Sequence, residues 1–178
     1  AKAVSEGIEL EGLYAVTESL SLGVTAAYLN AEYREFAAGC PANTVQAAQL
    51  ECYPNPNGPA GNQVQDLKGV QLDNAPEVTA TLFADYSVPV LNGLLFGSRL
   101  DTSYKDETSL DFSQDENLFA NDFWRMNLRF SIASMQDSWT VALTAFNLTD
   151  EQPPTFGGQE FLLPGVCWQN RARGREVE

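Results

Sequence analysis

The sequence has no histidine, few basic residues and no long run of apolar residues. Its 178 residues include 24 acidic and 10 basic side chains, which give a net charge of −14. A nucleic-acid-binding protein needs a basic surface to contact phosphates, so this charge argues strongly against that class. The absence of histidine removes the commonest general base and the commonest protein ligand of metal ions.

Membrane crossing by helices is also excluded, because no apolar run approaches the roughly 20 residues that a spanning helix needs. A transmembrane strand needs only about 9–11 residues of alternating character. Such alternation dominates this chain. In WRMNLRFSI at 124–132, apolar side chains alternate strictly with arginine, asparagine and serine. The pattern is therefore compatible with a β-sheet whose strands cross a membrane.

The alternating segments are separated by connections of two kinds. Tight turns are predicted near 17–19, 89–93 and 134–138, and they alternate with long loops at 37–75, 106–121 and 150–170. Short turns at one end and long loops at the other are the layout of an outer-membrane barrel. We therefore predict an all-β fold, an antiparallel up-and-down meander of about seven strands that forms a segment of a transmembrane β-barrel with extracellular long loops. The strands are expected near 4–16, 20–36, 76–88, 93–106, 121–134, 138–149 and 171–178.

The two faces of these strands differ in chemistry. The apolar faces at 20–28, 78–86 and 124–132 carry no charge. A cationic side chain facing lipid near the bilayer midplane would cost about 2–4 kcal/mol, so a charge-free face is expected there. Burying the opposite, charged face in a soluble core would be expensive unless each charge were paired. The predicted lipid-facing residues are Leu20, Leu22, Val24, Val78, Leu82, Met126, Leu128, Phe130, Trp139, Val141 and Leu143. The predicted lumen-lining residues are Glu9, Glu11, Glu77, Asp85, Arg99, Asp101, Arg125, Asn127 and Arg129.

Three cysteines are present, and two of them flank a short stretch of the first long loop. A disulfide between Cys40 and Cys52 would close a loop of about 13 residues, worth roughly 3 kcal/mol in the chain-entropy model. It would also imply an oxidising compartment. Two unpaired loop thiols are the alternative. Cys167 has no assigned partner.

Candidate chemical sites are few. Glu9 and Glu11 share a strand face about 7 Å apart, a separation seen in glycosidases, but two solvated carboxylates lining a lumen are the more ordinary interpretation. Six acidic residues in 106–122 could bind calcium or divalent cations that bridge lipopolysaccharide, although a solvated acidic loop is favoured. The triplet Asn147-Leu148-Thr149 matches a glycosylation acceptor and is read instead as a strand end. We expect no catalytic activity, no metal site and no cofactor.

Several segments together resemble the C-terminal barrel of TonB-dependent outer-membrane receptors. They are GIELEGLYAVTESLSLGVTAAYLNAEY at 7–33, LDNAPEVTATLFADYSV at 72–88, FWRMNLR at 123–129 and FNLTDE at 146–151, in the order that the family has. The resemblance implies a 22-stranded barrel in the full-length protein. Two departures are the ending REVE, where the family has a terminal aromatic, and the absence of the plug domain and TonB box. We therefore expect a fragment, about the last third of the barrel.

The resemblance also implies a function. The chain is expected in the outer membrane of a Gram-negative bacterium, where it would supply barrel wall and capture loops for a scarce nutrient such as a ferric siderophore, cobalamin or a glycan. The implied partners are outer-membrane lipid and lipopolysaccharide, that ligand, and the TonB energising complex through the missing plug. A passive porin-like channel and a secreted soluble β-sandwich binding module remain as alternatives.

Overall fold

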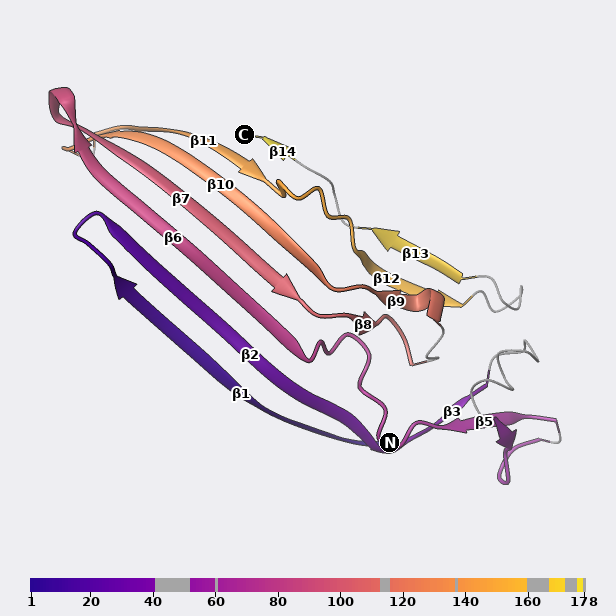
Figure 1. Ribbon diagram of the computed structural model, residues 1–178. Helices are drawn as coiled ribbons and strands as arrows, with labels where there is room; N and C mark the ends of the chain where they lie inside the picture. The colour runs from indigo at the N-terminus through magenta and orange to yellow at the C-terminus, as the bar shows by residue number, and fades with distance from the viewer. Residues whose placement is uncertain are drawn as a thin grey trace.

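A single seven-stranded antiparallel sheet dominates the structure, a computed structural model that describes residues 1–40, 52–59, 61–112, 116–136, 138–159, 167–171 and 176–177 (Figure 1). The spatial order is β1-β2-β6-β7-β10-β11-β14, so each strand of this sheet lies beside its neighbour in the chain. The prediction of an all-β antiparallel meander is confirmed. The sheet is open, with β1 and β14 at its two edges. Its strands are β1 (Lys2–Ala15), β2 (Leu20–Glu35), β6 (Val78–Val90), β7 (Leu94–Lys105), β10 (Phe123–Ser134), β11 (Thr140–Phe146) and β14 (Glu176–Val177).

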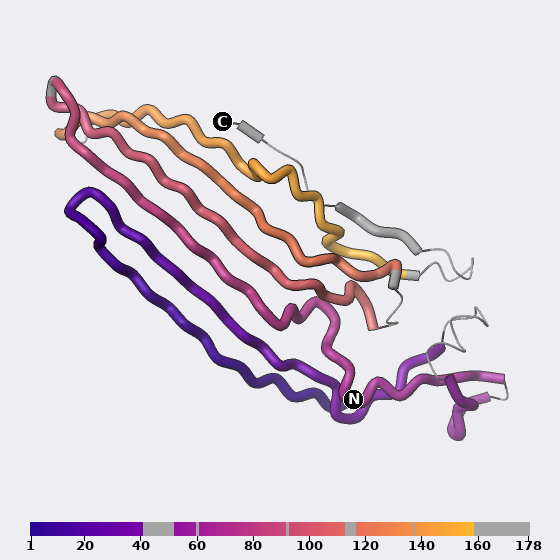
Figure 2. Tube along the Cα trace, in the orientation of Figure 1, coloured from indigo at the N-terminus to yellow at the C-terminus, as the bar shows by residue number. Residues whose placement is uncertain are grey.

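Three tight connections lie together at one end of the sheet, as the chain trace shows (Figure 2). Between β1 and β2, the hydroxyl of Thr17 accepts hydrogen bonds from the backbone N–H groups of Ser19 and Leu20, at 3.1 and 3.0 Å. Between β6 and β7, a single 3-10 turn, η1 (Leu91–Gly93), ends at a glycine with φ of 71°, in the region that favours glycine. Local polar and glycine chemistry therefore reverses the chain at this end.

The long connections at the opposite end contain strands of their own, which is a correction to the prediction of loops alone. In 37–75, β3 (Ala37–Gly39), β5 (Gln63–Asp66) and β4 (Tyr53–Pro54) form a small sheet. In 106–121, β8 (Thr108–Ser109) pairs with β9 (Phe119–Ala120) near the 3-10 turn η2 (Glu116–Leu118), and in 150–170, β12 (Pro154–Gln159) pairs with β13 (Cys167–Arg171). Strands of two to six residues offer too few alternations to be recognised in a sequence.

The predicted bounds of the last strand, 171–178, are also corrected by the structure. Arg171 ends β13, whereas Glu176 and Val177 form β14 and pair with Phe146 and Ala145 of β11. The residues 172–175 and 178 lie outside the described part of the chain. The seventh strand of the meander is thus present next to β11, but it begins later than the pattern indicated.

The buried apolar residues gather mainly among the long connections rather than on the sheet. Leu67, Leu110, Leu118 and Ala120 are buried there, with Leu118 at 0 % exposure. On the sheet, by contrast, large apolar side chains are exposed, and the exposed fraction of Val141 is 68 %. In Figure 1 the drawn sheet forms one layer without a second sheet against it, unlike a β-sandwich. Within the described residues, no helix has the length and apolar character needed to span a membrane.

Candidate functional site

Strand register brings the charge-free apolar stretches at 20–28, 78–86 and 124–132 onto one face of the sheet. Leu22 pairs with Ala84, Val24 with Leu82, and Phe130 with Leu143. Because side chains alternate along each strand, paired residues project from the same side of the sheet. All the predicted lipid-facing residues within the paired strands therefore come together on this face, which we call the outer face. Trp139 precedes β11 in the same alternation and is exposed.

The opposite face, here called the inner face, carries the charged side chains. Thr25 of β2 pairs with Glu11 of β1 on one side and with Thr81 of β6 on the other. The same register continues across β7 and β10, where Arg99 pairs with Arg129. Glu77 lies just before β6, and its carbonyl accepts the N–H of Leu29 at 2.8 Å. The inner face thus gathers all nine predicted lumen-lining residues: Glu9, Glu11, Glu77, Asp85, Arg99, Asp101, Arg125, Asn127 and Arg129.

Arg99 is the centre of a compact charged cluster on the inner face. Its Nε lies 3.0 Å from both carboxylate oxygens of Asp101, its Nη2 lies 2.8 Å from Oδ1 of Asp101, and its Nη1 lies 3.5 Å from Oδ2 of Asp85. The guanidinium also lies 4.3 Å above the ring centroid of Phe83. Two carboxylates and an aromatic face therefore compensate this charge. The sequence placed these residues on one face but did not indicate that they meet.

Phe83 itself lies across Gly23, its partner on β2. A Cβ atom at Gly23 would overlap the Phe83 ring. Gly23 therefore provides the space that the ring occupies, and the ring in turn supports Arg99. This stack of Gly23, Phe83 and Arg99 spans three adjacent strands.

Two further arginines on β10 lack such compensation. Among the described residues, no carboxylate lies within ion-pair distance of Arg125 or Arg129. The guanidinium of Arg125 lies 5.4 Å from the ring centroid of Phe123, and its Nε is buried with no hydrogen-bond acceptor among those residues. Within the part of the chain that the structure describes, β10 therefore presents two arginines on the inner face without a paired carboxylate.

Asn127 has a structural role that the sequence did not reveal. Its Oδ1 accepts the backbone N–H of Asn147 at 2.9 Å. Asn147 has a φ of 51° and is 4 % exposed, and its side chain bonds both the N–H and the carbonyl of Glu151. These bonds fix the exit from β11 into the third long connection. The glycosylation-like triplet therefore lies in the turn directly after β11, with Asn147 buried.

Glu9 and Glu11 line a hollow of about 400 Å³ on the inner face, floored by small residues of β2 and β6. The floor consists mainly of threonine and alanine side chains. Beside the two carboxylates, the lining of this hollow holds no other titratable side chain. The two glutamates fit a solvated wall better than a hydrolytic site.

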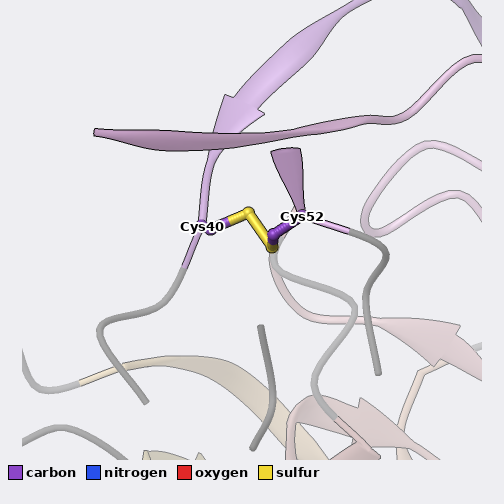
Figure 3. The surroundings of a disulfide bond; sticks show 2 residues. All are labelled: Cys40 and Cys52. Atoms are coloured by element: carbon purple, nitrogen blue, oxygen red, sulfur yellow. A yellow bond between two sulfur atoms is a disulfide. The ribbon is translucent and has the colours of Figure 1, made fainter. Parts of the chain in front are cut away.

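A disulfide joins Cys40 and Cys52 in the first long connection (Figure 3). Their Cα atoms are 6.3 Å apart. Cys40 donates its N–H to Gln63 of β5 at 3.0 Å, and Tyr53, next to Cys52, pairs with Val64 of the same strand. The disulfide therefore closes a small sheet that extends beyond β2. Cys167 begins β13, and its side chain lies outside the described part of the structure.

The first and second long connections are joined to each other at the same end of the sheet. The hydroxyl of Tyr33 donates a 2.6 Å hydrogen bond to Asp73, and the Tyr33 ring lies 4.8 Å from that of Phe36. Phe36 in turn meets Phe112 at 6.1 Å, edge to face. The backbone N–H of Asn74 donates to the carbonyl of Ser109 at 2.8 Å. An aromatic cluster and backbone hydrogen bonds thus hold the two connections together.

Burial of Tyr33, followed by its hydrogen bond to Asp73 and the charge of that carboxylate, raises the pKa of Tyr33 to about 12. Tyr33 lies beyond Tyr28, where the charge-free face of β2 ends, and therefore outside the crossing segment. No group of three potential metal ligands comes together within the described residues. The divalent-cation prediction for 106–122 includes Asp115, which lies outside them.

Comparison with known proteins gives a consistent result. Residues 1–148 match the family model described as "TonB dependent receptor-like, beta-barrel". The ferric yersiniabactin uptake receptor FyuA from Yersinia pestis is similar in structure over 98 % of this chain and 22 % of its own, with a TM-score of 0.67 and 14 % identity. The siderophore receptor PiuA from Acinetobacter baumannii is similar over 98 % of this chain and 21 % of its own, with a TM-score of 0.61 and 18 % identity. The chain thus spans about a fifth of either receptor. No curated protein matches the sequence.

Proposed function

Because the chain belongs to the TonB-dependent receptor β-barrel family of the Gram-negative outer membrane, we propose that it forms wall and capture loops of a receptor that imports a scarce nutrient. The outer face would contact lipid and the inner face would line the lumen. The joined long connections would face the cell exterior. The transport role is the part of this assignment that goes beyond the family and the location of the chain.

The observation that carries the proposal is the contrast between the two faces. The outer face carries exposed large apolar side chains on β1, β2, β6, β10 and β11, whereas the inner face holds Arg99, Asp85, Arg125 and Arg129. A charge-free face toward hydrocarbon and a polar lumen are what a transmembrane barrel requires. A folded soluble domain would instead bury the apolar face, since exposing it to water is costly.

The nutrient is proposed as a ferric siderophore in preference to cobalamin or a glycan. Both structural neighbours bear names that refer to siderophore reception or uptake. Capture would fall to the extracellular connections, because binding residues are concentrated on loops held by a rigid scaffold. Lipopolysaccharide would surround the outer rim, and the TonB energising complex would act through parts of the receptor outside this chain.

The test is uptake by cells that carry or lack the gene for the complete protein. Cells would be grown under iron limitation and supplied in turn with labelled ferric siderophores, cobalamin and oligosaccharides. We expect the cells to accumulate a ferric siderophore, and this accumulation should require both this gene and a functional TonB complex. Equal accumulation without the TonB complex would instead identify a passive channel, and a monodisperse folded chain in detergent-free buffer would contradict membrane insertion.

A further inference from the structure

The first and second long connections meet where β6 begins and β7 ends. Asn74 lies shortly before β6, and the N–H of Asp106, directly after β7, donates to the carbonyl of Val78 at 3.0 Å. Because β6 and β7 are neighbours in the sheet, the end of the first connection and the start of the second are held side by side. The pairing of two wall strands therefore brings the two connections into contact.

Asn74 makes the central contact between the two connections. Its N–H donates to the carbonyl of Ser109 at 2.8 Å, and its Nδ2 donates to the carbonyl of Leu110 at 3.4 Å. Asn74 has a φ of 56°, in the left-handed region that asparagine tolerates better than most residues. Ser109 and Leu110 are both buried. Separating the connections would take these donors from the carbonyls of two buried residues, which is unfavourable.

An aromatic contact between the connections accompanies these hydrogen bonds. The ring of Phe36 meets that of Phe112 edge to face, with the centroids 6.1 Å apart. The second connection has only a small core of its own within the described residues, formed by Leu110, Leu118 and Ala120, and its strands β8 and β9 have two residues each. A unit of that size is marginally stable by itself. The first connection therefore contributes to the stability of the second.

We propose that the first and second long connections open and close as one cooperative unit, in which each connection stabilises the folded state of the other. Contacts that exist only while both connections are folded couple their stabilities, and such coupling acts equally in both directions. Opening of either connection is thus transmitted to the other through Asn74 and Phe112. The inference rests on the proposed function only in treating these connections as the capture loops, which are then presented or released together.

The test is amide hydrogen exchange, followed by mass spectrometry, on the complete receptor that contains this chain, purified in detergent. The N–H of Gly69, which donates to Tyr33 at 2.7 Å, reports on the first connection, and that of Leu110, which donates to Leu118 at 2.8 Å, reports on the second. Leu118→Ala removes a fully buried side chain from the second connection. Tyr33→Phe is a milder change in the first, since it removes only the hydrogen bond to Asp73.

Leu118→Ala should speed exchange at Gly69 about tenfold, and Tyr33→Phe should speed exchange at Leu110 about threefold, although each substitution lies in the other connection. Adding Phe112→Ala to Leu118→Ala should change exchange at Gly69 by less than the product of the two separate effects, because both substitutions act through the same contact. The control is Leu91→Ala, which truncates an apolar side chain 85 % exposed at the opposite end of the sheet and should alter neither amide.

Faster exchange confined to the substituted connection, or no change at either amide, would overturn the proposal. Heat-modified electrophoretic mobility establishes that the barrel of each variant is folded. The exchange measurement requires neither a ligand nor transport, so its failure and the failure of the proposed function are distinguishable. Independent connections in a receptor that still imports a nutrient would remove only the cooperative unit.

Discussion

The hydroxyl of Tyr33 donates a 2.6 Å hydrogen bond to Asp73, and this contact joins the end of β2 to the return of the first long connection across 40 residues of sequence. Backbone hydrogen bonds run beside it, from Tyr33 N–H to the carbonyl of Val70 and from Gly69 N–H to the carbonyl of Tyr33, at 2.9 and 2.7 Å. These hydrogen bonds therefore hold the return segment of the first long connection against the end of β2. That relationship gives the first two predictions.

Substituting Tyr33→Phe should loosen the first connection while leaving the sheet intact. The change removes one hydrogen bond to a charged acceptor, worth about 1–2 kcal/mol, and keeps the ring contact with Phe36. The rate of limited proteolysis between β2 and β6 should rise by roughly tenfold. Thr79→Ser is a control at an inner-face position of β6. Equal protease resistance of Tyr33→Phe and the parent would contradict the prediction.

The Tyr33–Asp73 contact should also give a distinctive alkaline titration. Because the pKa of Tyr33 is raised to about 12, its contribution to stability is full below its ordinary value near 10 and is lost as the pH rises through 12. NMR of ¹³C-labelled tyrosine, assigned with Tyr33→Phe, measures this directly. Asp73→Asn should lower the pKa of Tyr33 only in part, since burial is the largest cause. An ordinary value for Tyr33 would show that the contact is absent.

Gly23→Ala should destabilise the barrel through the Phe83 ring. The added methyl group would overlap the ring, and overpacking of this kind costs about 1–3 kcal/mol. Urea unfolding of the complete receptor in detergent measures the loss. Gly39→Ala is the matched control, because a Cβ there meets nothing within 4 Å. Adding Phe83→Ala to Gly23→Ala should remove the overlap, and failure of this second substitution to recover any of the loss would contradict the stacking argument.

The assignment of lipid and lumen faces can be tested with two adjacent residues. Leu82 lies on the outer face at the middle of 78–86, and Thr81 lies on the inner face opposite Thr25. Leu82→Arg should destabilise the membrane-inserted barrel by about 2–4 kcal/mol, whereas Thr81→Arg should have a small effect. Unfolding in lipid vesicles measures both. Equal effects, or a larger effect for Thr81→Arg, would reverse or remove the assignment of faces.

Loss of the Cys40–Cys52 disulfide should act locally. The chain-entropy model gives about 3 kcal/mol for a loop of this length. Because this small sheet extends beyond the main sheet, we expect Cys40→Ser to increase proteolysis between residues 37 and 66 without changing the unfolding of the main sheet. Peptide mapping without reductant checks the bond itself, which should join the two cysteine peptides. Separate peptides under these conditions would contradict it.

The short strands in the long connections were not predicted, because sequence patterns indicate only the structure of consecutive residues. Alternation with a period of two is a property of consecutive residues, so the seven-strand meander, the three tight turns and the separation of charged from apolar faces were predictable. In 37–75 and 106–121, strands of two to four residues offer too few alternations. They form because neighbouring segments supply hydrogen-bonding partners that no local pattern announces.

The amino-acid sequence by itself determined which side chains share a face, because alternation assigns each residue of a strand to one side or the other. Only the tertiary structure decided which residues touch. The pairing of Phe83 with Gly23, of Asn127 with Asn147, and of Tyr33 with Asp73 depends on register and on the path of the chain between strands. Likewise, that Asp101 and Asp85 both meet Arg99 depends on distances along and across strands. Distances of that kind arise only when segments far apart in the sequence are brought side by side.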